Sequence, residues 1–244
     1  MKPTPPFQVI AHRGDKAHAP ENTIPAFEAG LACGAGGLEL DVRLTRDGVA
    51  VVHHDADFKR SAGDSRAVAD TTFSECQALD VGTRFSEAFA ETRVPTLQEV
   101  LERFLPRAPI DIELKAPDTP AAAAALLRDF PDAVRANATV TSFELDLLTE
   151  MRSLDGAVKL GWLTTKEVRA PWAELERLGA RTWAAHGPTL TAEACAEAHA
   201  RGYDVRCWAI HDLDAARRIV ALGADGCTYD DPAELLRALR TIHR

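Results

Sequence analysis

Several features are scarce or absent in this sequence of 244 residues, and each absence excludes a class of protein. Its cysteines are odd in number, widely spaced and without a CxxC pair, so we expect reduced thiols rather than a disulfide framework or a zinc cluster; they are Cys33, Cys76, Cys195, Cys207 and Cys227. No stretch approaches the roughly 18 apolar residues of a membrane span, and the first residues lack the apolar core of a signal peptide. We therefore expect a cytoplasmic protein without stable membrane association.

Positive charge is also in short supply. The chain has 28 Lys and Arg residues against 37 Asp and Glu residues, so its formal net charge is −9. Such a chain is repelled by nucleic-acid backbones and anionic lipid surfaces, which excludes general binding to either. A small anionic ligand remains compatible with this charge, provided that cationic side chains are placed in its site.

No linker rich in proline, glycine or serine divides the chain, so we expect one domain over residues 1–244. Short apolar runs predict eight strands, near Phe7–Ala11, Gly37–Val42, Pro109–Lys115, Ala138–Ser142, Val158–Leu163, Arg181–Ala185, Asp204–Ala209 and Asp225–Thr228. Segments of helical period predict eight helices, near Asn22–Cys33, Leu97–Phe104, Pro120–Asp129, Glu144–Leu154, Lys166–Leu178, Thr191–Arg201, Asp212–Leu222 and Pro232–Thr241. This alternation predicts an α/β fold of the (β/α)8 TIM-barrel type, since an open doubly wound sheet usually has fewer strands.

Local signals support these helices, and one segment interrupts the alternation. Three Thr-x-x-Glu sequences match the capping box that begins many helices, at Thr96, Thr141 and Thr164. Residues 43–95 are predicted to begin with a hairpin, which a polar stretch follows. Because they follow the second strand, we expect an insertion on the C-terminal face of the barrel, where the active sites of such barrels lie.

Acidic residues alternate with apolar ones on the second and third predicted strands. Glu39 and Asp41 share one face of the second strand, and Asp111, Glu113 and Lys115 share one face of the third. With the apolar face turned to the helices, these carboxylates point into the barrel and need a compensating positive charge. Oxygen ligands of this kind favour Mg²⁺ or Ca²⁺ over zinc. Simple pairing of the acids with Arg13, Arg43 and Lys115 is the alternative.

Two histidines follow predicted strands, His12 after the first and His54 after the hairpin. Histidine suits proton transfer near neutral pH, so a pair on either side of a phosphate group could act as base and acid. Arg13 offers a planar guanidinium group to phosphate oxygens, and Lys115 offers a point charge. A structural or surface role is the simpler interpretation of the other histidines that we considered, which are His18, His53, His199 and His243.

An ordered set of motifs runs along nearly the whole chain: Ala11-His12-Arg13-Gly14, Pro20-Glu21-Asn22-Thr23, Glu39-Leu40-Asp41-Val42, Asp47-Gly48-Val49, His54-Asp55, Glu113-Leu114-Lys115, Thr141-Ser142-Phe143, Val205-Arg206-Cys207-Trp208 and Asp230-Asp231-Pro232. This set resembles the glycerophosphodiester phosphodiesterase family of the cytoplasmic bacterial type. The resemblance implies a TIM barrel that hydrolyses glycerophosphodiesters to sn-glycerol 3-phosphate and an alcohol. The chain departs from the family's usual residues at Asp15 to His18, His211, Tyr229 and Asp231, which leaves the preferred alcohol open.

The resemblance also implies roles for individual residues. Glu39, Asp41 and Glu113 would bind one divalent cation, Mg²⁺ or Ca²⁺, and His12 and His54 would be the catalytic histidines. Substrate contacts would come from Arg13, Lys115, Phe143, Trp208 and Glu21, with Glu21 either a cation ligand or a partner of Arg13. We expect His12 to act as base and His54 as acid, in a reaction that passes through a cyclic phosphate.

Three other functions stay open at this point. One is a sphingomyelinase D-like phospholipase on the same barrel, although the sequence shows no clear apolar or basic rim. The others are a metal-dependent barrel of the enolase type and a barrel that binds phosphodiesters without cleaving them. The oligomeric state is also open, a homodimer included.

Overall fold

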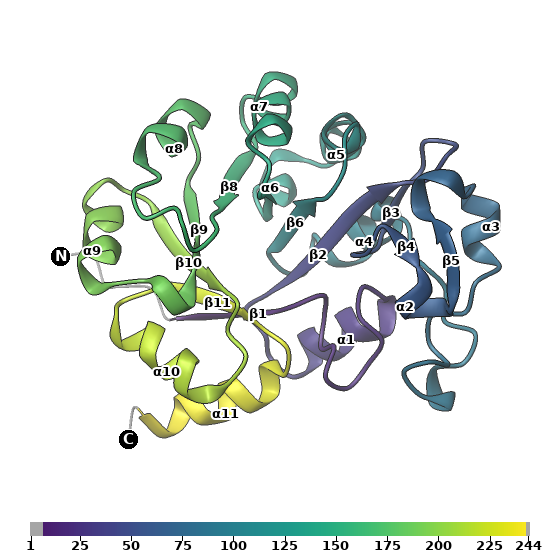
Figure 1. The fold of residues 1–244 in the computed structure, drawn as a ribbon, viewed down its shortest axis with the longest axis horizontal. Coiled ribbons are helices and arrows are strands. Elements are labelled where there is room, and N and C mark those ends of the chain that lie inside the picture. Colours follow the sequence, from purple (N-terminus) through teal and green to yellow (C-terminus); the bar gives the residue numbers. More distant parts are fainter. Residues whose placement is uncertain (1–6, 243–244) are drawn as a thin grey trace.

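A closed barrel of parallel strands forms the centre of the molecule. The computed structural model describes residues 7–242. Eight parallel strands follow one another around the barrel, and β1 closes it by pairing with both β2 and β11 (Figure 1). These strands are β1 (Gln8–Ala11), β2 (Gly37–Leu44), β6 (Ile110–Leu114), β7 (Ala138–Ser142), β8 (Lys159–Leu163), β9 (Thr182–His186), β10 (Asp204–Trp208) and β11 (Gly226–Tyr229). The predicted TIM barrel is confirmed.

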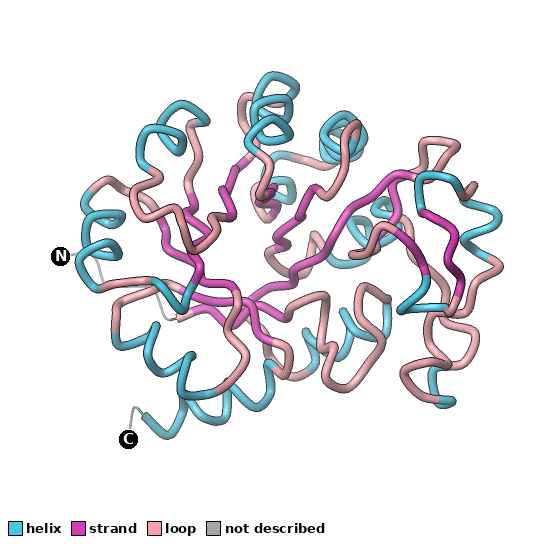
Figure 2. Tube along the Cα trace, in the orientation of Figure 1, coloured by secondary structure: helices cyan, strands magenta, loops and turns pink. Residues whose placement is uncertain are grey.

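Helices surround the barrel and connect its strands, as Figure 2 shows. They are α1 (Ile24–Ala32), α4 (Leu97–Phe104), α5 (Thr119–Arg128), α6 (Asp132–Arg135), α7 (Leu145–Leu154), α8 (Trp172–Leu178), α9 (Ala192–Ala200), α10 (Leu213–Ala221) and α11 (Pro232–Ile242). The predicted helix Lys166–Leu178 begins only at Trp172, because Pro171 precedes it and the turn before it is not helical. None of the helices in the described part of the chain is long and apolar enough to cross a membrane.

The alternation on the strands places apolar and acidic side chains as predicted. Leu38, Leu40 and Val42 of β2 are fully buried in the core between the barrel and the helices. Glu39 faces the lumen, where it lines a cavity with Glu113 of β6. The hydrophobic effect thus fixes which face of each strand turns inward, and the acids follow from the two-residue period.

Of the three predicted capping boxes, the structure has only the threonine half of the one at Thr96. The hydroxyl of Thr96 accepts a hydrogen bond from the backbone N–H of Glu99 at the start of α4. Thr141 instead belongs to β7, and Thr164 accepts a hydrogen bond from Trp183 Nε1 at 2.8 Å, well before α8 begins. A capping box that we did not predict, between Thr72 and Glu75, begins α3 (Phe73–Gln77).

Residues 43–95 form a small structure of their own beside the end of β2 (Figure 1). The predicted hairpin is present, with β3 (Ala50–Val52) antiparallel to β2. It is followed by β4 (Asp57–Phe58), α2 (Lys59–Ala62), β5 (Asp64–Ala67), η1 (Val68–Asp70), α3 and η2 (Glu87–Phe89). A second apolar cluster holds this segment together, made of Val51, Phe58, Val68, Cys76, Val81 and Val94. The hairpin brings His54, just after β3, to the lumen.

Candidate active site

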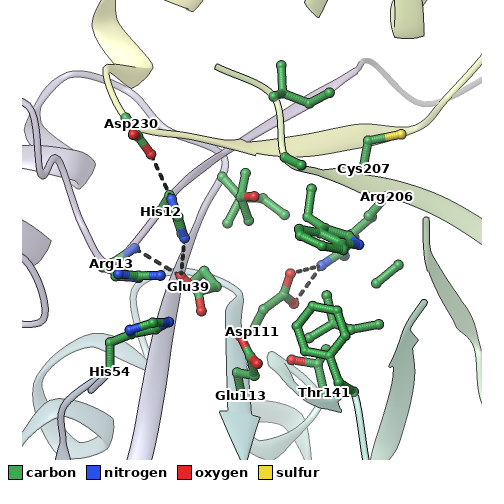
Figure 3. A pocket seen from close by; sticks show the side chains of 18 of the residues that line it. His12, Arg13, Glu39, His54, Asp111, Glu113, Thr141, Arg206, Cys207 and Asp230 are labelled. Carbon is green, nitrogen blue, oxygen red and sulfur yellow. Dashed lines mark hydrogen bonds and ion pairs between the residues drawn. The ribbon is translucent and has the colours of Figure 1, made fainter. Parts of the chain in front are cut away.

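A cavity of about 250 Å³ opens at the C-terminal ends of the barrel strands. It collects residues from all eight barrel strands and from the end of the hairpin, and Figure 3 shows the arrangement of those that it labels. Eight of the ten predicted site residues line it: His12, Arg13, Glu39, His54, Glu113, Lys115, Phe143 and Trp208. Asp41 lies beside the cavity, completely buried, and Glu21 lies behind Arg13.

The three predicted cation ligands lie together. One carboxylate oxygen each of Glu39, Asp41 and Glu113 lies within 4.8 Å of the others, and all three residues are buried. Pairing of β2 with β6 produces this cluster, because it places Asp41 beside Glu113. Asp41 Oδ1 is buried without a hydrogen bond, and its nearest charge is Lys115 Nζ at 3.1 Å.

Burial and mutual repulsion oppose the ionisation of this cluster. Burial and the carboxylates of Asp41 and Glu113 raise the pKa of Glu39 well above its usual range. Burial, and then the charge of Asp41, raise the pKa of Glu113 to about 7. Asp41 is also buried, but Lys115 and Arg13 outweigh its desolvation and lower its pKa to about 2. An oxygen-rich cluster in which two acids resist ionisation, and one buried oxygen accepts no hydrogen bond, fits a divalent cation.

Each of the two histidines has a carboxylate partner at its Nδ1 atom. His12 Nδ1 lies 2.7 Å from Asp230 Oδ1, and His54 Nδ1 lies 2.7 Å from Asp55 Oδ1. This leaves Nε2 of each ring for the cavity, and Nε2 of His12 is 3.9 Å from Glu39 Oε2. Burial lowers the pKa of both histidines, against the opposing effect of the partner carboxylates. Both rings are therefore set up as neutral imidazoles with a fixed orientation.

Sequence reasoning overlooked these two carboxylates, although both lay inside quoted motifs. Asp55 follows His54 directly, which was a usable signal, whereas Asp230 is 218 residues away from His12 and only the closure of the barrel brings them together. His53, treated as structural, is buried and lies 3.0 Å from Ser61 Oγ through its Nε2 atom.

Arg13 connects the acids at the cation cluster. Its backbone has φ of +57°, and its N–H donates to Glu39 Oε2 at 3.0 Å. Its side chain lies 3.2 Å from Asp41 and donates to Glu21 at 2.9 Å. Glu21 also accepts two hydrogen bonds from Arg60, each of 2.7 Å, so the structure places it as the partner of Arg13 and Arg60.

The predicted pairing of the acids with cations is present in part. Lys115 Nζ lies 2.5 Å from Glu113 Oε1, next to its contact with Asp41. Arg43 does not pair with the acids, because its Nε donates to the backbone carbonyl of His54 at 2.8 Å. It therefore holds the hairpin end in place beneath His54.

Apolar side chains form the opposite wall of the cavity. Phe143 and Trp208 meet edge to face with ring centroids 4.9 Å apart, and Trp208 Nε1 donates to the carbonyl of Thr164 at 3.0 Å. Below them an ion pair that we did not predict joins Arg206 of β10 to Asp111 of β6 (Figure 3). Polar and apolar halves of one cavity suit a ligand with a charged group and an organic substituent.

The departures from the usual motif residues are spread over different places, and among them Tyr229 is buried in the core. Lys16 Nζ is 3.1 Å from Asp230 Oδ1, so the carboxylate behind His12 has two cationic neighbours when that ring is protonated. His211 lines the cavity. A second group of possible ligands, Asp15, His18 and Asp231, is outside the cavity.

Comparison with known proteins gives a consistent picture. Residues 12–234 match the model of the glycerophosphoryl diester phosphodiesterase family. The chain is 32% identical over 242 residues to a glycerophosphodiester phosphodiesterase of Caldanaerobacter subterraneus, covering 95% of this chain and 97% of that one. A glycerophosphodiester phosphodiesterase of Bacillus altitudinis is 31% identical over 234 residues, covering 92% of this chain and 95% of the relative.

Solved structures agree with these sequence relatives. A phosphodiesterase of Oleispira antarctica in complex with the product sn-glycerol-3-phosphate superposes with a TM-score of 0.87 at 26% identity, over 96% of both chains. A putative glycerophosphoryl diester phosphodiesterase of Silicibacter pomeroyi gives a TM-score of 0.88 at 28% identity, covering 99% of this chain and 95% of that one.

Proposed function

The chain belongs to the glycerophosphoryl diester phosphodiesterase family, and from this membership we propose that it uses a divalent cation to hydrolyse glycerophosphodiesters to sn-glycerol 3-phosphate and an alcohol. One observation carries the proposal: three clustered carboxylates and two histidine–carboxylate pairs border one cavity. That combination supplies a site for a cation and two groups for proton transfer around a single phosphate group.

Glu39, Asp41 and Glu113 would hold the cation, as Mg²⁺ or Ca²⁺. The buried oxygen of Asp41 that accepts no hydrogen bond and the raised pKa values of the two glutamates support this assignment. A bound cation would neutralise phosphate charge and lower the pKa of a hydroxyl group next to it.

His12 would act as the base and His54 as the acid. The Nε2 atom of His12 lies on the side of Glu39, where the attacking glycerol hydroxyl would sit close to the cation site. It would take the proton of that hydroxyl while Asp230 stabilises the imidazolium formed. His54 would protonate the departing alkoxide, and the roles would reverse when water opens the resulting cyclic phosphate.

Arg13 and Lys115 would stabilise the charge on the phosphate oxygens. Both reach the cation cluster from its edge, within 3.2 Å of Asp41, so phosphate bound there would lie beside two fixed positive charges. Phe143 and Trp208 would contact the organic part of the substrate on the apolar side.

We also keep the proposal of one catalytic domain over residues 1–244 and of a cytoplasmic location. The match to the family model over residues 12–234 supports the first.

Incubation of the purified protein with glycerophosphocholine tests the proposed reaction. We expect release of choline and sn-glycerol 3-phosphate, abolished by EDTA and restored by Mg²⁺ or Ca²⁺. Cyclic phosphate as the final product would indicate a sphingomyelinase D-like reaction instead. Binding of the diester without turnover, with the cation present, would contradict hydrolysis.

A further inference from the structure

An ion pair crosses the lumen of the barrel below the candidate active site. Arg206 Nη1 lies 2.6 Å from both carboxylate oxygens of Asp111, although the residues are 95 positions apart in the chain. Their side chains are 19% and 9% exposed, so the pair is largely removed from bulk water. Figure 3 shows it beside the labelled residues of the cavity.

The position of this pair follows from the strand period. Asp111 comes two residues before Glu113, and Arg206 comes two residues before Trp208, so both side chains enter the lumen one layer deeper, by about 6–7 Å. Arg206 and Thr182 also line a second cavity of about 270 Å³ towards the other end of the barrel. The Asp111–Arg206 pair therefore forms part of the floor that separates the two cavities.

The wall above this floor is apolar. It is formed by Phe143, Leu163, Ala184, Trp208 and Ile210. Such a wall by itself would accept a hydrocarbon chain as readily as a polar one. The floor would not accept a hydrocarbon chain. Methylene groups placed against the ion pair would displace the water that remains there, and they could not replace the hydrogen bonds of that water.

The guanidinium group of Arg206 has N–H groups that are available for further hydrogen bonds. Within residues 7–242 it makes no hydrogen bond other than those to Asp111 through Nη1, and none of its nitrogens is a buried atom without a partner. A hydroxyl group at the floor could accept from Arg206 and donate to Asp111, whereas a methylene group can do neither.

We propose that the Asp111–Arg206 pair determines substrate specificity, by admitting only a short, hydroxylated substituent to the barrel lumen and rejecting an acylated one. This inference rests on the proposed function. It assigns to the pair the discrimination between glycerophosphodiesters and their monoacylated forms, the lysophospholipids.

Paired substrates test this inference, with glycerophosphocholine compared with its hexanoyl-lysophosphatidylcholine analogue. For the wild-type protein we expect kcat/KM to favour glycerophosphocholine by at least about 100-fold, since a site with buried polar groups discriminates strongly against a ligand that leaves them unpaired. This ratio requires no variant, and equal rates on the two substrates would overturn the inference. No hydrolysis of glycerophosphocholine would instead contradict the proposed function.

Removal of both charges should weaken the discrimination. In the double variant Asp111→Leu, Arg206→Met the apolar side chains are close in size and no charge is left unpaired. We expect its ratio to fall by about tenfold or more, mainly through a gain on the acylated substrate. A ratio within about threefold of the wild-type value would contradict the inference.

Matched variants separate specificity from stability. Arg206→Lys keeps a charge at the floor and should retain most of the discrimination. Arg135→Met removes a contact of 3.4 Å with the buried carboxylate of Asp155, away from the cavity, and should leave the ratio unchanged. If the double variant does not fold, Asp111→Ala with Arg206→Leu also removes both charges and every hydrogen-bonding group of the pair, and an unchanged ratio in that protein would count against the inference.

Discussion

The Nδ1 atom of His12 lies 2.7 Å from Oδ1 of Asp230, so a residue from the end of the first barrel strand is oriented by one from the end of the last. A carboxylate in this position selects the tautomer with the proton on Nδ1 and stabilises the charged ring. His54 has the same kind of contact with Asp55, so each of the two histidines is oriented by a carboxylate at Nδ1.

Asp230→Asn should therefore impair catalysis more than substrate binding. The amide can keep a hydrogen bond to the ring but can favour the wrong tautomer and carries no charge, so we expect kcat to fall by about 10²–10⁴-fold with KM little changed. Steady-state kinetics on glycerophosphocholine measure this. Asp214→Asn is the control, since that side chain is exposed and, among residues 7–242, forms an ion pair only with Arg217. Wild-type kcat in Asp230→Asn would refute the role given to this carboxylate.

Cation affinity should depend on pH in a defined direction. Because the pKa of Glu113 is raised to about 7 without a cation, protons compete with the cation below that pH. We expect binding of Mg²⁺ or Ca²⁺ to weaken between pH 8 and pH 6 and to release protons, as isothermal titration calorimetry in two buffers of different ionisation enthalpy can measure. Affinity independent of pH, with no proton release, would exclude Glu113 as a ligand.

The raised pKa of Glu113 should also make the stability of the cation-free protein depend on pH. A carboxyl group with a pKa raised in the folded state stabilises the fold at low pH, and this contribution is lost as pH rises from its unfolded value of 4.5 through about 7. We expect the Tm in EDTA to fall over this range, and added cation to restore it most at the high end. Asp41→Asn, which lowers the repulsion, should flatten the dependence.

The thiols should be largely unreactive in the folded protein. Four of the five cysteines are buried, and burial raises the pKa of Cys76 and Cys195 to about 11 and that of Cys207 to about 12. Only Cys33 is partly accessible. Titration with a chromogenic disulfide should therefore detect at most one thiol rapidly in native protein and all five in denaturant. Fast reaction of several native thiols would contradict the packing described.

The barrel could be predicted because its signals are local. Two-residue alternation on β2 and β6 sets the inward face, and glycines and caps mark where elements end, so each βα unit can be recognised from its own residues. The capping errors at Thr141 and Thr164 show the limit of such signals. Both residues satisfy the Thr-x-x-Glu pattern, but tertiary contacts of the strand ends decide their conformation.

Contacts across the lumen could not be predicted from sequence patterns, because they join residues that are far apart in the chain. Asp111 was expected to point inward, but nothing near it in sequence identifies Arg206 as its partner. Arg60, which holds Glu21 and Asp55 together, lies in the segment 43–95, where no periodic pattern was evident. The resemblance of motifs supplied the proposed cation ligands and the two proposed catalytic histidines, whereas the contact of His12 with Asp230 was identified from the structure.

The assignment of His12 as base and His54 as acid is tested most directly by changing the leaving group. A p-nitrophenolate group needs no proton to depart, whereas the choline alkoxide does. His54→Ala should therefore lose about 10²–10⁴-fold in kcat on glycerophosphocholine but keep most of its rate of p-nitrophenolate release in a single turnover of the p-nitrophenyl ester of glycerol 3-phosphate, because that release reports the first step alone. His12→Ala should lose activity on both substrates, and His199→Ala, whose histidine lies outside the cavity, should lose it on neither. Equal losses of His54→Ala on both esters, or rescue of His12→Ala by the better leaving group, would contradict the account.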